Sequence, residues 1–303
     1  MEKKKTKQQK RYDALSVLLA LGLVAADAVM WYQIIFASAA IAAATSARIY
    51  FLDVGQGDAE LVVLPGNIKI LTDAGPDTKV LQSLAKVLPQ SDTYIDVAII
   101  SHPEVDHFGG YNNLLDYYRV GAFIYNGRSA EPGNAAWEQL MAKIKDKNIP
   151  LITLGAGDKI HYAGNEIDML SPDIDFAQSG ELNDTGLVEL IKTPQLSALF
   201  TADTGFNVEN VLLAGESHQS IRADVLKIAH HGSKYASNEA FLRAVDPKVV
   251  VIEVAAKNSY GQPASSTIAR IASSTNARLF RTDKDGTIAV MAEGGTIEIS
   301  KEK

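Results

Sequence analysis

The sequence contains no cysteine among its 303 residues. Disulfides and thiolate metal sites are therefore excluded, and any metal ion must be held by histidine, aspartate, glutamate or water. The chain also lacks internal repeats, and its low-complexity content is limited to one Ala/Ser tract near the N-terminus. Hydrophobic residues make up 47% and charged residues 21% of the chain. That composition is ordinary for a globular protein with a sizeable core.

Basic residues are in the minority, 29 against 36 acidic ones, which gives a net charge of −7. Residues 1–13 hold six basic and two acidic residues, a net of +4, so the remainder carries −11 (−7 minus 4). An acidic body argues against a broad nucleic-acid-binding surface.

The N-terminal region is predicted to be a membrane anchor. A basic segment, residues 1–13, precedes an apolar stretch over 14–44 in which Asp27 is the one charged residue. The stretch exceeds the roughly 20 residues that span a bilayer. The positive-inside rule leaves 1–13 as a cytoplasmic tail and places the rest of the chain, as a single-pass protein of the cell membrane, on the extracytoplasmic side. Two alternatives are a cleaved signal of a secreted protein, ending at the small residues of 37–47, and a buried or surface helix.

The remaining chain, 48–303, changes to short strands, helices and hairpins. The run "VAII" at 97–100 is β-branched and predicts a buried strand, whereas "NAAWEQLMAKIKDKN" at 134–148 has the apolar spacing of a helix. Strands and helices alternate with hairpins between them. We therefore predict one mixed α/β domain over 48–303.

The stretch "SHPEVDHFGG" at 101–110 follows that buried strand directly. Ligands of open α/β sheets lie at such strand ends. His102, Glu104 and Asp106 point the same way if the segment is extended. Without a ligand, two carboxylates crowded among two histidines in six residues would cost stability, since like charges repel. We therefore predict metal binding at 102–107.

Further acidic and histidine residues follow other predicted strands, namely Asp73, Asp203, His230 and His231. Strand ends on one rim of a sheet can converge, and a pair of divalent cations needs such convergence of carboxylates and imidazoles. Each residue alone also has a structural explanation. Asp73 and Asp203 precede turns, which aspartate favours, and a histidine pair at a strand end is commonly surface polar.

Seven motifs together resemble a known family. They are "FLDVGQGDAELV", "LTDAG", "SHPEVDHFGG", "NDTGLV", "FTADTG", "LKIAHHGSKYAS" and "NSYGQP", and they run in order over nearly the whole body, from about 49 to 290. The sequence resembles the metallo-β-lactamase superfamily, and more closely the stand-alone relatives of the ComEC competence-protein metallo-hydrolase domain. This resemblance implies a four-layer αβ/βα metallo-β-lactamase sandwich, here preceded by one N-terminal transmembrane helix, with the site on one edge between two sheets.

The resemblance implies two divalent metal ions, zinc or manganese. His102 and Glu104 would serve one ion, Asp106 and His107 the other, and Asp203 would bridge them. One or both of the adjacent histidines would complete the shell, with His230 favoured as ligand and His231 as a substrate or supporting contact.

The other site residues also come from the resemblance. Asp58 and Asp73 would orient the histidine ligands, and Asp106 and Lys234 would act in catalysis, Lys234 by holding a phosphate or oxyanion. Asn183 stands where other members have a histidine, and Gln262 replaces a histidine of the family pattern "YGHP". Asn258 and Tyr260 are expected to contact substrate or to shape their loop.

The expected function is a membrane-anchored binuclear hydrolase that cleaves phosphodiesters, single-stranded DNA among them, with a bridging water whose pKa the two cations lower. The chain lacks a many-helix channel and a separate oligonucleotide-binding domain, so DNA uptake would need a membrane channel partner. Two alternatives stay open: a hydrolase of another ester or lactone, and a non-catalytic metal-binding module. A β-lactamase role is not expected, because Glu104 departs from the zinc pattern of those enzymes.

Overall fold

The computed structural model describes residues 21–27, 29–31, 46–215 and 220–303. The predicted tail, 1–13, lies outside these ranges, and of the predicted anchor only 21–27 and 29–31 fall within them, both helical. Across the described ranges, no helix combines the length and the apolar character that crossing a bilayer requires.

The first sheet has eight strands and holds the N-terminal half of the body together with the C-terminal hairpin. Its order is β15-β14-β1-β2-β3-β4-β5-β6, and β3 to β6 run parallel to one another. The strands are β1 (Arg48–Phe51), β2 (Glu60–Leu64), β3 (Ile68–Thr72), β4 (Tyr94–Ile100), β5 (Arg119–Tyr125), β6 (Leu151–Thr153), β14 (Ile288–Glu293) and β15 (Thr296–Lys301). The predicted strand at 97–100 is therefore the end of β4.

The second sheet has seven strands in the order β13-β12-β11-β10-β9-β8-β7. Here β10 to β13 are parallel, and β7 to β10 are antiparallel. The strands are β7 (Lys159–Tyr162), β8 (Asn165–Ser171), β9 (Val188–Lys192), β10 (Ser197–Phe200), β11 (Val225–Lys227), β12 (Val249–Ile252) and β13 (Arg278–Arg281).

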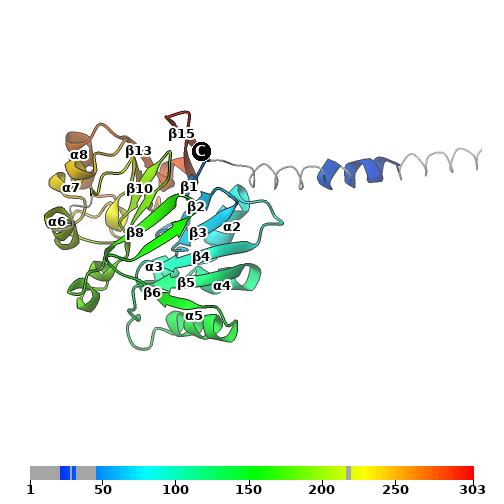
Figure 1. Ribbon diagram of the computed structural model, residues 1–303, viewed down its shortest axis with the longest axis horizontal. Helices are drawn as coiled ribbons and strands as arrows, with labels where there is room; N and C mark the ends of the chain where they lie inside the picture. The colour runs from blue at the N-terminus through cyan, green and yellow to red at the C-terminus, as the bar shows by residue number, and fades with distance from the viewer. Residues whose placement is uncertain (1–20, 28, 32–45, 216–219) are drawn as a thin grey trace, which may run out of the picture.

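Helices cover the outer face of each sheet, which gives four layers (Figure 1). The α-helices of 46–215 and 220–303 are α2 (Lys79–Val87), α3 (Val105–Phe108), α4 (Tyr111–Tyr117), α5 (Ala135–Asp146), α6 (Phe206–Ala214), α7 (Glu239–Val245), α8 (Ser265–Ser274) and α9 (Thr282–Asp285). The same part of the chain holds the 3-10 turns η1 (Phe176–Gln178), η2 (Asn183–Thr185) and η3 (Ala229–Gly232). The α/β sandwich that the resemblance implied is thus confirmed.

Three apolar clusters hold the layers together. One packs α2, α4 and α5 on the first sheet, one fills the space between the sheets, and one packs α6 to α8 on the second sheet. In the middle cluster, Phe51 and Phe200 meet edge to face with ring centroids 5.7 Å apart. The predicted helix at 134–148 is α5, which begins where Asn134 accepts a hydrogen bond from the Trp137 backbone N–H.

The direction of the parallel strands decides where the site forms. β3 and β4 end in the segments that carry Asp73 and His102, and β10 and β11 end just before Asp203 and His230. Parallel strands bring their carboxyl ends to one edge of a sheet. Because the two sheets stack, both edges contribute to one site.

Candidate metal centre

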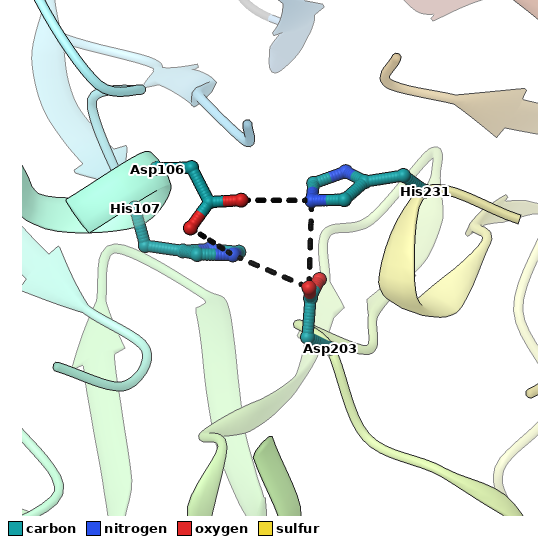
Figure 2. Close-up of side chains that lie close together, drawn as sticks. All are labelled: Asp106, His107, Asp203 and His231. Carbon is teal, nitrogen blue, oxygen red and sulfur yellow. Dashed lines mark ion pairs between the residues drawn. The ribbon is translucent and has the colours of Figure 1, made fainter. Parts of the chain in front are cut away.

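Four side chains converge at this edge: Asp106, His107, Asp203 and His231 (Figure 2). Each offers one ligand atom, and these atoms all lie within 4.8 Å of one another. Asp106 and His107 come from α3, Asp203 from the segment after β10 and His231 from η3. The side chains thus come from both sheets and point at one another.

Asp203 lies between the two imidazoles. Its Oδ2 atom is 3.5 Å from Nε2 of His107 and 3.4 Å from Nε2 of His231. Asp106 closes the ring, with Oδ2 at 3.4 Å from Nε2 of His231 and Oδ1 at 4.0 Å from Nε2 of His107. Such spacings leave room for a cation within reach of all four groups.

The backbone makes this convergence possible through one close approach and one unusual turn. Gly57, at φ +132°, packs directly on the Asp106 carbonyl, so that any side chain at this position would collide with backbone. His230 and His231 both have left-handed backbone angles, φ 51° and 53°. That conformation is costly for residues other than glycine and is found mainly at functional sites.

Each buried imidazole is fixed through its Nδ1 atom. Nδ1 of His107 lies 2.7 Å from Asp73 Oδ2, and Nδ1 of His231 donates to the Glu253 carbonyl at 2.9 Å. Nδ1 of His102 lies 3.0 Å from Ser101 Oγ, a hydroxyl that itself donates to Asp73 Oδ2 at 2.6 Å. An acceptor on Nδ1 sets the tautomer that leaves Nε2 free for a metal.

The Nε2 atoms of His102, His107 and His231 are all buried and have no hydrogen-bond partner. Oδ1 of Asp203 is in the same condition. Buried polar atoms without partners are rare and costly in folded proteins, so several at one point call for a ligand. The donor set of imidazole nitrogen and carboxylate oxygen suits a divalent ion such as zinc or manganese.

His102 and Glu104 lie immediately beside this cluster. The His102 and His107 rings have centroids 4.0 Å apart, and Oε2 of Glu104 is 3.9 Å from Nε2 of His102. Burial, aided by the Asp106 carboxylate, raises the pKa of Glu104. Burial also lowers the pKa of His102 to about 3. A neutral imidazole with a free Nε2 is the form that binds a metal.

The pKa values of the buried histidines also indicate that the carboxylates of this cluster require a nearby positive charge. Burial would lower the pKa of His231, but the Asp203 and Asp58 carboxylates outweigh it and raise that pKa to about 10. The pKa of His107 is likewise raised, against burial, by Asp203 and Asp73. Without another cation, both imidazoles would therefore hold a proton to balance the carboxylates. A bound metal ion would replace those protons.

Comparison with known proteins identifies a family whose members bind divalent metal ions, as this cluster is arranged to do. Residues 52–252 match the metallo-beta-lactamase superfamily. The chain belongs to that superfamily. Its members are generally metal-dependent hydrolases that bind divalent metals.

Curated relatives point to a narrower group within the superfamily. The chain is 26% identical over 263 residues to ComE operon protein 3 of Bacillus subtilis (strain 168). The matched region covers 80% of this chain and 32% of that protein. It is 28% identical over 225 residues to Recombination protein 2 of Haemophilus influenzae, covering 73% of this chain and 26% of that protein. The chain thus spans about a third or less of the length of these relatives. The resemblance to a ComEC-like domain is confirmed.

A solved structure shares the fold. The metallo-beta-lactamase fold protein YhfI from Bacillus subtilis superimposes with a TM-score of 0.53 at 13% identity, over 84% of this chain and 100% of that one. At this level of identity the likeness concerns the arrangement of sheets and helices alone.

The two adjacent histidines take places opposite to those expected from the sequence. His231, not His230, lies in the cluster with Asp106, His107 and Asp203, and His231 is buried. The His230 side chain is 33% exposed, and its Nε2 lies 3.7 Å from Asp203 Oδ2 on the solvent side. The left-handed turn through both residues explains the exchange, because it turns the second ring inward.

A buried lysine under the cluster was not anticipated. Lys227, the last residue of β11, pairs with Asp58 and donates to the Ala202 carbonyl at 2.9 Å. Its Nζ is also 3.8 Å from Asp203 Oδ1. Burial would lower the pKa of Lys227, but Asp58 and Asp203 raise it, so the ammonium stays charged. The available signal was a single lysine inside the apolar strand "VLKIA".

Asp58 and Asp73 lie behind the imidazoles, as expected of orienting groups. Oδ1 of Asp58 is 3.2 Å from Nδ1 of His231, while Asp73 holds His107. Two further buried glutamates, Glu60 and Glu253, stand behind Asp58. Burial raises the pKa of Glu253 to about 8 and that of Glu60 well above its usual value. Sequence reasoning missed both glutamates, because each occupies a place in or beside a buried strand.

The remaining predicted residues lie around the cluster. Asn183 lines a cavity beside Asp203, and its buried Oδ1 has no partner. Lys234 is exposed, with Nζ 4.8 Å from the centroid of the Tyr235 ring. Tyr260 is exposed on the loop after β12.

Asn258 and Gln262 fix the loop between β12 and α8. Asn258 donates to the Gln262 carbonyl at 2.8 Å and accepts from the Gln262 backbone N–H at 3.0 Å. Gln262 Nε2 donates to the His230 carbonyl at 3.1 Å, and Gln56 Nε2 donates to Gln262 Oε1 at 2.9 Å. Asn258 therefore shapes the loop, and the glutamine that replaces the family histidine supports the histidine turn from outside.

Proposed function

We propose that this protein is a binuclear metal-dependent hydrolase that cleaves phosphodiesters, with single-stranded DNA as its substrate class. One observation carries the metal-dependent part: three buried imidazoles are each fixed through Nδ1 and leave Nε2 without a partner beside Asp203. The substrate class is supported by the ComEC-like resemblance and by relatives such as Recombination protein 2.

The ligand sets follow from the two groups of side chains. We assign Asp106, His107 and His231 to one ion and His102 with Glu104 to the other, with Asp203 facing both. Divalent ions held there would polarise a phosphoryl oxygen and lower the pKa of a water molecule. They would also offset the carboxylates, which would otherwise repel an anionic phosphodiester.

The chain's own groups supply the remaining chemistry. Asp106 is only half-buried, so its carboxylate can orient an attacking water. His230, one-third exposed beside Asp203, can donate a proton to the leaving alkoxide. Lys234, whose Nζ lies 4.8 Å from the centroid of the Tyr235 ring, can attract the phosphate charge.

The cellular setting is part of the same proposal. The basic tail 1–13 and the apolar stretch 14–44 would hold the chain in the cell membrane with the hydrolase domain outside the cytoplasm. A membrane channel partner would then carry the product strand. Protease treatment of intact cells or spheroplasts tests this placement, because only an extracytoplasmic domain is digested without lysis.

Catalysis is tested on the full chain purified in detergent. With Mn²⁺ or Zn²⁺, we expect cleavage of single-stranded DNA and of bis-p-nitrophenyl phosphate, both abolished in His231→Ala and Asp203→Ala. His161→Ala, a change of an exposed histidine on β7, is the matched control and should retain full activity. Turnover of carboxylic esters or lactones alone would mean a different hydrolase, and bound metal with no turnover would mean a binding module.

A further inference from the structure

A cavity of about 340 Å³ opens directly beside the metal centre. Its lining includes Asn183, Asp184, Asp203, Phe206, His230 and Tyr235. The lining includes the carboxylates of Glu181 and Asp184, in and just before η2, and aromatic residues at the start of α6 and after η3. The cavity therefore offers both acidic and aromatic groups to a substrate.

Tyr235 is an exposed aromatic residue of this cavity. Its side chain is 65% exposed, yet the loop that carries it is firmly held. Glu209, buried in α6, accepts hydrogen bonds from the backbone N–H groups of Ser237 and Asn238 and from Asn238 Nδ2. The Tyr235 carbonyl accepts from the Phe206 N–H at 3.1 Å.

Arg270, from α8, fixes the same loop from its other side. Its guanidinium donates to the carbonyls of Lys234 at 3.2 Å, Ala236 at 2.7 Å and Ser237 at 3.0 Å. It also lies 5.5 Å from the centroid of the Phe206 ring. Figure 1 shows the three helices, α6, α7 and α8, grouped on this side of the second sheet. The fold thus positions the loop before any ligand arrives, which reduces the entropy lost on binding.

Lys234 adds a positive charge beside the Tyr235 ring. Its ammonium lies 4.8 Å from the ring centroid, within cation–π range. An exposed ring next to an ammonium matches one repeating unit of a nucleic acid, a planar base joined to a phosphate. The carboxylates of Glu181 and Asp184, which also line the cavity, would repel phosphates, so the phosphate is expected at the ammonium of Lys234 instead.

We infer that Tyr235 is a base-stacking subsite that selects single-stranded polynucleotides and presents the adjacent phosphodiester to the metal centre. This inference rests on the proposed phosphodiesterase function. A base can stack on the ring only if its face is free, and in a duplex neighbouring base pairs cover both faces. The subsite therefore discriminates against double-stranded DNA without reading sequence.

The test compares two substrates on the full chain with Mn²⁺. One is a single-stranded oligonucleotide, and the other has the same sugar–phosphate backbone with abasic residues. The variants are Tyr235→Ala, Tyr235→Phe and Tyr117→Ala. Tyr117 is the matched control, because it is 70% exposed at the end of α4 and does not line the cavity. Thermal unfolding verifies that each variant folds.

We expect Tyr235→Ala to lower kcat/KM on the base-containing strand by about tenfold, mainly through KM, and to leave the abasic strand unchanged. Tyr235→Phe, which keeps the ring, and Tyr117→Ala should match the wild type on both strands. Unchanged cleavage of the base-containing strand by Tyr235→Ala, or an equal loss on both strands, overturns the inference.

A wild-type chain that cleaves neither strand would contradict the proposed function rather than the subsite. Fluorescence anisotropy with the same two labelled strands then decides the inference. Binding of the base-containing strand that is about tenfold weaker in Tyr235→Ala supports it. Equal binding by the two proteins refutes it.

Discussion

The Nδ1 atom of His107 lies 2.7 Å from the Oδ2 atom of Asp73. The same carboxylate accepts hydrogen bonds from the Ser101 hydroxyl at 2.6 Å and, through Oδ1, from the Ser101 backbone N–H at 2.9 Å. Asp73 therefore joins the end of β3 to the end of β4 and sets the direction of the His107 ring. The metal centre depends on this carboxylate although Asp73 does not line it.

Replacing Asp73 by asparagine tests that dependence. Asp73→Asn keeps the shape but removes the charge that fixes the His107 tautomer, so metal affinity should fall by about 10- to 100-fold. Competition with a coloured chelator measures the change. Asp116→Asn, at an exposed aspartate of α4, should leave the affinity as it is. Equal affinities in the two variants would mean that Asp73 only shapes a turn.

The adjacent histidines should differ sharply in their effect on metal content. His231→Ala removes a buried Nε2 from the cluster, and the protein should lose one of two equivalents of metal. His230→Ala should retain both equivalents and lose turnover instead, because its imidazole faces the cavity. Elemental analysis after dialysis distinguishes them. The reverse pattern would restore the arrangement expected from the sequence.

The buried Lys227–Asp58 pair should be essential for stability. Lys227→Met leaves the Asp58 carboxylate buried without its cation, and we expect the free energy of unfolding to fall by about 3–5 kcal/mol. The double variant Lys227→Met, Asp58→Asn removes both charges and should recover part of that loss. Urea unfolding in the presence of EDTA gives both values. A single variant as stable as the wild type would refute the pairing.

Glu189 gives a prediction about pH. Burial, with the Asp73 carboxylate nearby, raises the pKa of Glu189 from 4.5 to about 8. The folded state therefore keeps a proton that the unfolded chain releases, so this residue's contribution to stability is complete below pH 4.5 and is lost as the pH rises toward 8.

Glu189→Gln removes this titration. Compared with the wild type, the variant should gain about 1.4 kcal/mol of stability per pH unit as the pH rises from 5 to 8, and gain little below pH 4.5. Urea unfolding at a series of pH values measures the difference. Glu138→Gln, at an exposed glutamate of α5, should show the same dependence of stability on pH as the wild type. If the stability of Glu189→Gln depends on pH in the same way as that of the wild type, Glu189 is ionised in the folded protein.

Much of the architecture could be predicted because the local patterns agree with the tertiary structure. The run at 97–100 is fully apolar because β4 is covered on both faces, and α5 shows a helical stripe because only one of its faces packs on the sheet. The motif at 102–107 predicted metal binding because its charged residues follow a buried strand directly.

The features that the sequence did not predict are those that backbone geometry decides. No pattern in "AHHGS" tells which histidine turns inward, since that depends on two consecutive left-handed residues. Lys227 escaped notice because a lysine in a short strand is usually solvated, and its partner Asp58 lies 169 positions away. Ion pairs that join segments of the two sheets can be identified only from the three-dimensional structure, in which the sheets are stacked.

The account depends most on cations sitting among the imidazoles. Anomalous diffraction from crystals of the protein grown with Mn²⁺ or Zn²⁺ tests this directly. We predict two peaks, one within coordination distance of Nε2 of His107 and of His231 and one at Nε2 of His102, both next to Asp203. A fully loaded crystal with no peak at these atoms, or with metal only among Asp58, Glu60 and Glu253, would contradict the proposed metal centre.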